Sequence, residues 1–274
     1  MARIVITGAS DGIGAAGARR LAADGHEVVV VGRSRAKTEA VAAELGAPLH
    51  LADFSRLDDV RRLAAELERY ERIDVLVNNA GGVMGRREVT EDGFEKTFQV
   101  NHLAPFLLTT LLLPRLVAAR AKVIQTASAA ANHFGGDFDL DDLNHERRYA
   151  PMKAYGDAKL ANVLFTRELD RRHRADGIAA VAFHPGVVRS NFASETGLAM
   201  RVLYHSPLKY LFMISAETSA KRLSWLVDGE DWEPGGFYGD RTPIALKLQD
   251  DGAIARELWD RSERMLAAVD TQLS

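Results

Sequence analysis

The stretch Thr7-Gly-Ala-Ser-Asp-Gly-Ile-Gly14 decides the fold that we predict for this sequence. It follows a short apolar run that begins at Arg3, and it leads into an Ala-rich segment, residues 13–23, with helical spacing of apolar side chains. Glycines between a strand and a helix let the backbone turn tightly and approach a pyrophosphate at the helix N-terminus. The spacing is GxxxGxG rather than GxGxxG, so a plain strand–helix turn is the alternative for this motif taken alone.

Strand and helix patterns alternate along the chain. A Val run at residues 27–31 predicts a strand buried on both faces. Further strands are predicted at 48–51, 74–77, 122–126, 178–183 and 235–239, and helices at 35–45, 57–70, 91–120, 153–174, 216–227 and 253–269. Because this alternation favours right-handed βαβ units, we predict one doubly wound α/β domain over residues 1–274, with a mostly parallel Rossmann-type sheet and helices on both faces.

Composition excludes several classes of protein. With 274 residues, 47% hydrophobic and 27% charged, the chain is neither disordered nor fibrous. A chain of this length buries about three quarters of its unfolded surface, so it needs no disulfide or metal to hold it. The absence of cysteine excludes a disulfide scaffold, a thiolate zinc site and a cysteine nucleophile.

Charge, histidine spacing and hydropathy argue against binding to nucleic acid, metal or a membrane. A net charge of −3 gives no footprint for nucleic-acid binding. The eight histidines show no HxxxH or HExxH spacing, so we predict no metal site. The chain runs from Met1 directly into the first strand, and apolar runs such as 106–114 fall short of the about 20 residues of a membrane span. We therefore expect a cytoplasmic protein without a signal peptide or an integral membrane anchor.

Residues after the second and third strands are candidates for binding adenosine. In dinucleotide folds the end of the second strand meets the ribose, where an acidic residue suits NAD and an arginine suits a 2′-phosphate. Here Arg33 and Ser34 follow Gly32, although a solvated helix start would look the same. Asp53, followed by Phe54, comes after the third strand and could accept a hydrogen bond from the adenine amino group. The alternative is that Asp53 only caps the next helix.

A second group of motifs suggests catalysis. Tyr155-Gly-Asp-Ala-Lys159 places a phenol and an amine four residues apart, on one face of a helix. Bringing a phenol pKa from about 10 to about 7 takes roughly 4 kcal/mol, which a nearby ammonium can help to supply. Taken alone, Tyr-x-x-x-Lys is common and usually inert. Ser128, at the end of a strand, could stabilise an alkoxide, and Asn101 could hold a water that relays protons to Lys159.

In combination, these motifs resemble the short-chain dehydrogenase/reductase superfamily over nearly the whole chain. The family signatures TGxxxGxG, NNAG and YxxxK are present at 7–14, 78–81 and 155–159, and the PG motif at 184–190. The resemblance implies about seven strands and a nicotinamide cofactor. It implies the catalytic tetrad Asn101, Ser128, Tyr155 and Lys159. It implies cofactor contacts at Gly8, Ser10, Asp11, Gly12, Ile13, Gly14, Arg33, Ser34, Asp53, Phe54, Asn79, Ala80, Gly81, Tyr155, Lys159, Pro185, Gly186, Val188 and Ser190.

A narrower resemblance is to the retinol dehydrogenase-like branch, which includes WW domain-containing oxidoreductases. The segments 100–106, 159–169 and 184–190 carry it, together with an acidic insert, residues 137–144, between Ser128 and Tyr155. In this insert Phe138 and Leu140 favour a loop docked by its apolar side over a calcium site. The branch generally prefers NADP(H), in agreement with Arg33. Two features depart from it: no N-terminal anchor is visible, and Asp11 stands where some NADP-preferring relatives carry a base.

The sequence therefore predicts an NADP(H)-dependent enzyme that interconverts an alcohol and a ketone or aldehyde. Residues 194–214 mix Leu, Met, Tyr and Phe after the PG motif, which predicts a substrate lid and a bulky, apolar substrate. An ordered surface segment or oligomer contact is the alternative for this stretch. The resemblance implies a homo-oligomer, because paired helices such as those at 93–116 and 153–174 often form dimer faces in this superfamily. A non-catalytic NADP(H)-binding regulator or scaffold is the alternative function.

Overall fold

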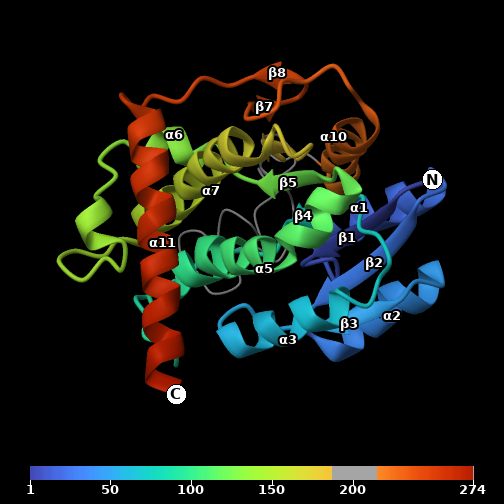
Figure 1. The fold of residues 1–274 in the computed structure, drawn as a ribbon, viewed down its shortest axis with the longest axis horizontal. Helices are drawn as coiled ribbons and strands as arrows, with labels where there is room; N and C mark the ends of the chain where they lie inside the picture. The colour runs from blue at the N-terminus through green and yellow to red at the C-terminus, as the bar shows by residue number, and fades with distance from the viewer. Residues whose placement is uncertain (187–214, 274) are drawn as a thin grey trace, which may run out of the picture.

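The computed structural model describes residues 1–186 and 215–273, which build one eight-stranded sheet in the order β3-β2-β1-β4-β5-β6-β7-β8 (Figure 1). Its strands are β1 Arg3–Thr7, β2 Glu27–Gly32, β3 Leu49–Leu51, β4 Val75–Asn78, β5 Lys122–Thr126, β6 Ala179–His184, β7 Phe237–Gly239 and β8 Thr242–Pro243. The first seven pair in parallel, as predicted. The sequence pattern missed β8, a two-residue strand that pairs antiparallel with β7. The predicted lid at 194–214, Val188 and Ser190 lie outside the described residues.

Helices cover both faces of the sheet, as predicted. They are α1 Gly12–Ala23, α2 Arg35–Leu45, α3 Leu57–Leu67, α4 Lys96–Phe98, the π-helical turn η1 Gln99–Leu103, α5 Ala104–Ala119, α6 Ala130–Phe134, the 3-10 turn η2 Leu140–Asp142, α7 Pro151–His173, α10 Ala216–Asp228 and α11 Asp251–Leu273. Helices α3, α5, α7 and α11 share one apolar core with one face of the sheet. Helices α1, α2 and α10 share a second core with the other face.

The Val run of β2 explains why two cores form. Val29 and Val31 face the first core, and Val28 and Val30 face the second, because successive side chains of a strand point to opposite faces. All four side chains are buried. The strand is therefore buried on both faces, as its unbroken apolar sequence predicts.

One long apolar helix crosses the first core. The segments α4, η1 and α5 join into a continuous helix, Lys96–Ala119, of 24 residues with a mean hydropathy of 1.5 in its most apolar window. By length and composition it could cross a membrane, which differs from the expectation that no apolar run is long enough. The share of that window buried inside the fold is 61%. A core helix passes the same test, so this is weak evidence for a membrane span.

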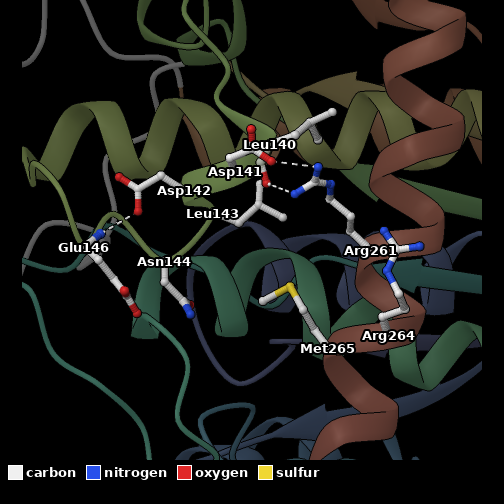
Figure 2. Close-up of a pocket in the computed structure, with 9 residues that line it drawn as sticks. All are labelled: Leu140, Asp141, Asp142, Leu143, Asn144, Glu146, Arg261, Arg264 and Met265. Atoms are coloured by element: carbon white, nitrogen blue, oxygen red, sulfur yellow. Dashed lines mark hydrogen bonds and ion pairs between the residues drawn. The ribbon is translucent and has the colours of Figure 1, made fainter.

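The acidic insert docks by its apolar side, as predicted. Phe138 and Leu140 pack against the first core. Arg261 of α11 donates to the Leu140 carbonyl over 2.9 Å and pairs with Asp141 at 2.8 Å (Figure 2). The insert is thereby connected to the C-terminal helix.

Candidate active site

A glycine-lined cradle forms where β1 meets α1. Gly8 has φ of 65°, and a Cβ built on it would lie 2.8 Å from the Cα of Ala80. A Cβ on Gly14 would lie 2.3 Å from the Gly8 carbonyl oxygen. Only glycine fits both positions. The bare backbone at a helix N-terminus suits a pyrophosphate, so the residues present fit a dinucleotide.

The NNAG motif braces this cradle from the neighbouring strand. The Thr7 hydroxyl accepts hydrogen bonds from the amides of Asn79 and Ala80, each at 3.0 Å. The Asn79 side chain donates back to the Thr7 carbonyl over 3.0 Å. Asn78 instead points into the core and donates to Thr109 over 2.9 Å. The first asparagine is thus structural, and the second fixes the ends of β1 and β4 relative to each other.

The adenosine side of the cradle is formed at the end of β2. A Cβ on Gly32 would lie 2.8 Å from the Cβ of Ser10, so the first two strand–helix junctions touch. Arg33 and Ser34 follow and are exposed. Within the described part of the chain, no hydrogen bond or ion pair engages the Arg33 side chain, and Ser34 starts α2 without a side-chain cap. Both side chains are therefore available to a ligand at this junction.

Asp53 and Phe54 serve the fold more than the sequence suggested. One Asp53 oxygen accepts from the amide and hydroxyl of Ser55, at 2.9 and 2.8 Å. Asp53 therefore shapes the turn before α3. This role is close to the alternative that Asp53 caps the helix, although the N-cap residue itself is Arg56. Phe54 is 5% exposed and belongs to the first core. The Phe54 side chain therefore serves the core of the fold.

Helix α7 carries Tyr155 and Lys159 one turn apart, and both side chains are buried. The Lys159 Nζ lies 5.7 Å from the centroid of the Tyr155 ring and donates to the carbonyl of Thr126 over 2.9 Å. Burial lowers the pKa of Lys159 to about 7. The amine therefore changes charge near neutral pH, next to a phenol.

Gly81 separates this pair from Asn101. A Cβ on Gly81 would lie 2.4 Å from the Asn101 Oδ1 and 3.2 Å from the Lys159 Nζ. Asn101 lies in η1, and its amide donates to the carbonyls of Gly82 and Thr97 over 2.9 and 2.8 Å. Its Oδ1 accepts from the Gly82 amide at 3.1 Å. The side chain thus connects the helix to the end of the NNAG motif.

Ser128 approaches the same place from the end of β5. Its hydroxyl accepts from the Ala130 amide at 3.2 Å. Ala130 belongs to a small apolar cluster with Tyr155 and Val83. The structure therefore brings Ser128, Tyr155, Lys159 and Asn101 to one region at the carboxyl edge of the sheet, where open α/β sheets bind ligands.

His184 ends β6 beside the loop that carries Ser128. Its Nδ1 accepts from the amides of Ala129 and Gly186, at 3.3 and 3.4 Å. Burial, followed by the charge of Arg222 and by His133, lowers the pKa of His184 to about 4, so the ring is neutral at pH 7. The histidine before Pro-Gly is the only local signal, and it does not reveal a bond to the residue after Ser128.

Two side chains of helix α10 hold the backbone next to the Pro185–Gly186 turn. Ser219 donates to the carbonyl of Pro185 over 2.6 Å, and Arg222 donates to that of His184 over 3.3 Å. No local sequence pattern marks Ser219 for this task, because the contact joins distant parts of the chain.

A separate hollow of about 340 Å³ lies between the acidic insert and α11 (Figure 2). Polar side chains such as Asp142, Glu146, Arg261 and Arg264 line it, and no member of the proposed tetrad does. Its rim is wide and mainly charged, unlike the enclosed apolar pockets that bind small organic molecules. In the described part of the chain, no group of three or more His, Asp or Glu is arranged to hold a metal.

A doubly wound parallel sheet with this cradle and a buried Tyr–Lys pair defines a dinucleotide-dependent oxidoreductase. The sequence profile of the family described as short chain dehydrogenase matches residues 2–138. A Streptomyces sp. (strain C5) protein, named as a candidate daunorubicin C-13 ketoreductase, is 42% identical over 94% of this chain and 90% of its own length. Retinol dehydrogenase 13 of Homo sapiens is 38% identical over 96% of this chain and 84% of its own length.

A solved structure from Mycobacterium paratuberculosis, described as an uncharacterized protein, is also similar. It superposes with a TM-score of 0.75 at 34% identity, covering 97% of this chain and 93% of the other. The chain therefore belongs to the short-chain dehydrogenase/reductase family, in its retinol dehydrogenase-like branch. It is an alcohol/carbonyl oxidoreductase that binds a nicotinamide dinucleotide and acts on a small molecule.

Proposed function

We propose that this protein interconverts an alcohol and a ketone or aldehyde on a bulky, largely apolar substrate, with NADP(H) as its cofactor. The observation that carries the proposal is the buried pair Tyr155 and Lys159 beside Gly81, at the rim of the glycine cradle. The bound nicotinamide supplies or accepts the hydride. The remaining chemistry is the movement of one proton and the stabilisation of one oxygen.

Tyr155 is the proton donor in the reduction direction and the proton acceptor in oxidation. The Ser128 hydroxyl donates a hydrogen bond to the same substrate oxygen, where negative charge develops. A protonated Lys159 favours the phenolate form of Tyr155. Both amide hydrogens of Asn101 are engaged by Gly82 and Thr97. A relay water at Asn101 would therefore bind its backbone, and the side chain acts by fixing the helix beside Lys159.

Three features support NADP(H) over NAD(H). Arg33 is exposed directly after β2, at the position that meets the ribose in this fold. The first turn of α2 carries no acidic residue. The N-terminus of a helix is electropositive, so it adds to the attraction of an arginine for a 2′-phosphate.

The substrate class rests on the relatives and on the surface near Tyr155. The two relatives above are named for daunorubicin and retinol, both large molecules with extended apolar parts. Phe134, the last residue of α6, is 42% exposed, and Met152 packs against the apolar cluster around Tyr155. Such side chains suit an apolar ligand better than a sugar or a small acid.

A screen of carbonyl substrates with NADPH and NADH tests the proposal, following the loss of reduced-nicotinamide absorbance. The panel contrasts retinal, steroid ketones and polyketide ketones with small polar aldehydes and keto acids. We expect the highest kcat/KM on a bulky apolar carbonyl with NADPH. A charge-assisted contact predicts an NADPH preference of about ten- to a hundredfold. The highest kcat/KM with NADH, or on a small polar carbonyl, would contradict the corresponding half of the proposal.

The variant Arg33→Asp tests the part of the proposal that concerns the cofactor. It places a carboxylate that repels the 2′-phosphate and can accept from the 2′-hydroxyl of NADH. We expect the ratio of kcat/KM for NADPH over NADH to fall by at least about tenfold. An unchanged ratio would show that Arg33 does not contact this part of the cofactor.

A further inference from the structure

His102 lies in the π-helical turn η1, directly after Asn101, and is 1% exposed. In this turn the Ala104 amide donates to the Gln99 carbonyl, five residues back rather than four. Such turns are rare, and they occur frequently at functional sites. Since a regular α-helix is the more stable form of an isolated segment, contacts from outside the helix hold η1 in its π-helical form.

The His102 ring is hydrogen-bonded to the C-terminal helix. Its Nε2 lies 2.9 Å from the Oγ of Ser262 on α11, and the Ser262 hydroxyl donates to the Leu258 carbonyl over 2.8 Å. Because that hydroxyl has one hydrogen, the network assigns the ring hydrogen to Nε2, with Ser262 as its acceptor. Ser262 is fully buried. The bond therefore joins η1 to α11 inside the core, where water does not compete for it.

The environment of the His102 ring keeps it neutral. Burial lowers the pKa of His102 to about 3, and the Asn162 side chain on α7 opposes part of this shift. Aromatic rings pack around it, with centroids 5.1 Å away for Phe98 and 6.2 Å away for Phe165. His102 therefore neither gains nor loses a proton near pH 7. Its contribution is a fixed position.

Asn101 and His102 hold the same turn from two sides. The Asn101 amide donates to the Gly82 carbonyl over 2.9 Å, next to the NNAG motif, and His102 reaches α11. A Cβ on Gly81 would lie 2.4 Å from the Asn101 Oδ1 and 3.2 Å from the Lys159 Nζ, so Asn101 is close to the lysine. A shift of one residue along an α-helix rotates a side chain by about 100°. Relaxation of η1 to a regular helix would therefore turn Asn101 away from Gly82.

We propose that His102 is a positioning residue for the reaction. Its bond to Ser262 keeps η1 in the π-helical form and thereby holds Asn101 beside Lys159. The C-terminal helix α11, which carries no member of the tetrad, thus supports the catalytic region. The inference rests on the proposed function, because the position of Asn101 affects the rate only if Tyr155 and Lys159 move the proton.

Steady-state kinetics of His102→Leu and His102→Gln, with the best carbonyl of the screen, test the inference. Leucine keeps the apolar volume and removes the hydrogen bond. We expect kcat to fall about ten- to a hundredfold, with KM and the cofactor Kd within about twofold of the wild type. The amide nitrogen of glutamine reaches a place similar to Nε2 and should restore kcat to within about threefold. Equal losses in the two variants would overturn the proposed role of the bond.

Ser262→Ala tests the same bond from its other end, independently of how His102→Leu folds. It removes the acceptor and keeps the ring, so kcat should fall about tenfold. Thr166→Val is its matched control. Thr166 is also fully buried and donates to a carbonyl one turn back, that of Asn162, over 2.8 Å. We expect Thr166→Val to leave kcat within about twofold, and equal losses in the two variants would contradict the inference.

A double-variant cycle shows whether His102 acts through Asn101. Asn101→Ala alone should lower kcat, and adding His102→Leu should then lower it by no more than about twofold further. Additive losses, or full kcat in either single variant, would overturn this inference alone. Hydride transfer at the wild-type rate in Tyr155→Phe would instead overturn the proposed function on which it rests.

Discussion

At the scale of single residues, Lys159 is the group whose environment has the clearest chemical consequence. Its buried amine has a pKa lowered to about 7, whereas an unfolded chain keeps the ordinary value of about 10.4. Between these values the unfolded chain binds a proton that the native chain lacks. The free energy of unfolding therefore gains a contribution that increases as the pH rises from about 7 to about 10.

Cofactor binding should reverse this shift at Lys159. Phosphate charge and ribose hydroxyls favour the ammonium form, so binding raises the lysine pKa and takes up a proton. We expect proton uptake on NADPH binding at pH 7.5–8, and an affinity that falls as the pH rises through that window. Calorimetry in two buffers of different ionisation enthalpy measures the uptake, and Lys159→Met should abolish it. Equal heats in both buffers for the wild type would contradict the prediction.

His184 is the second residue with a specific consequence. Its neutral Nδ1 accepts from the amides on either side of the site, those of Ala129 and Gly186. We infer that it is a positioning residue for the Ser128 loop. His184→Leu leaves both amides unsatisfied and should lower kcat about tenfold, with a smaller change in the Kd for cofactor. His184→Asn offers an acceptor at a similar place and should restore most of kcat; equal losses in both variants would exclude this role.

At the scale of elements, the first seven strands were predicted to within a residue or two. The Val run gave β2 as 27–31, and the structure has Glu27–Gly32. The unbroken run of β-branched apolar residues made this prediction possible. The predicted helix 91–120 instead begins at Lys96, because Glu95 caps it with bonds to the amides of Thr97 and Phe98, and it contains the π-helical turn η1. The sequence pattern does not show that turn.

The sequence predicted which residue types form the candidate site. It did not predict the contacts between them. TGxxxGxG, NNAG and YxxxK predicted which segments meet at the edge of the sheet. They did not show that Gly81 separates Asn101 from Lys159, or that Phe54 turns into the core. Contacts of this kind join residues far apart in the chain, so no local spacing encodes them.

Gly81 gives a prediction at this scale, because it lies where the NNAG loop, η1 and α7 meet. The Cβ of Gly81→Ala would overlap the Asn101 side chain and crowd Lys159. Overpacking of this kind costs about 1–3 kcal/mol of the free energy of unfolding, and activity should fall further than stability because the displaced groups are those of the site. Gly136→Ala is the control, since its Cβ meets no atom within 4 Å. Denaturant unfolding and steady-state kinetics measure both effects, and a fully active Gly81→Ala would contradict the packing described.

At the scale of the whole molecule, the acidic insert and α11 join parts of the chain that lie far apart in sequence. Helix α11 lies across α7 and reaches the insert (Figures 1 and 2). Lys153 of α7 donates to the Asp137 carbonyl over 2.8 Å, and Arg261 holds Leu140 and Asp141 from the other side. The insert is thus held at its first residue and in its middle, next to the helix that carries Tyr155.

Arg261→Ala should loosen this connection. It removes the hydrogen bond from a charged group to the Leu140 carbonyl and the ion pair with Asp141, which is 68% exposed, so most of the effect should come from the hydrogen bond. We expect a loss of about 1–2 kcal/mol in the free energy of unfolding and faster proteolysis within residues 137–146. Arg264→Ala is the matched control on the same helix, because Arg264 is 63% exposed and pairs with Glu257 of its own helix, a pair that should contribute under about 0.5 kcal/mol. Indistinguishable proteolysis of the two variants would contradict the proposed role of Arg261.

The proposed reaction depends on Tyr155 as its acid and base. The most direct measurement is single-turnover hydride transfer in Tyr155→Phe, using the best carbonyl found in the screen and cofactor in excess. The variant keeps the buried ring and removes only the hydroxyl, so cofactor affinity should stay within about threefold while the rate falls about a hundred- to ten-thousandfold. Hydride transfer in Tyr155→Phe at a rate close to that of the wild type would contradict the account.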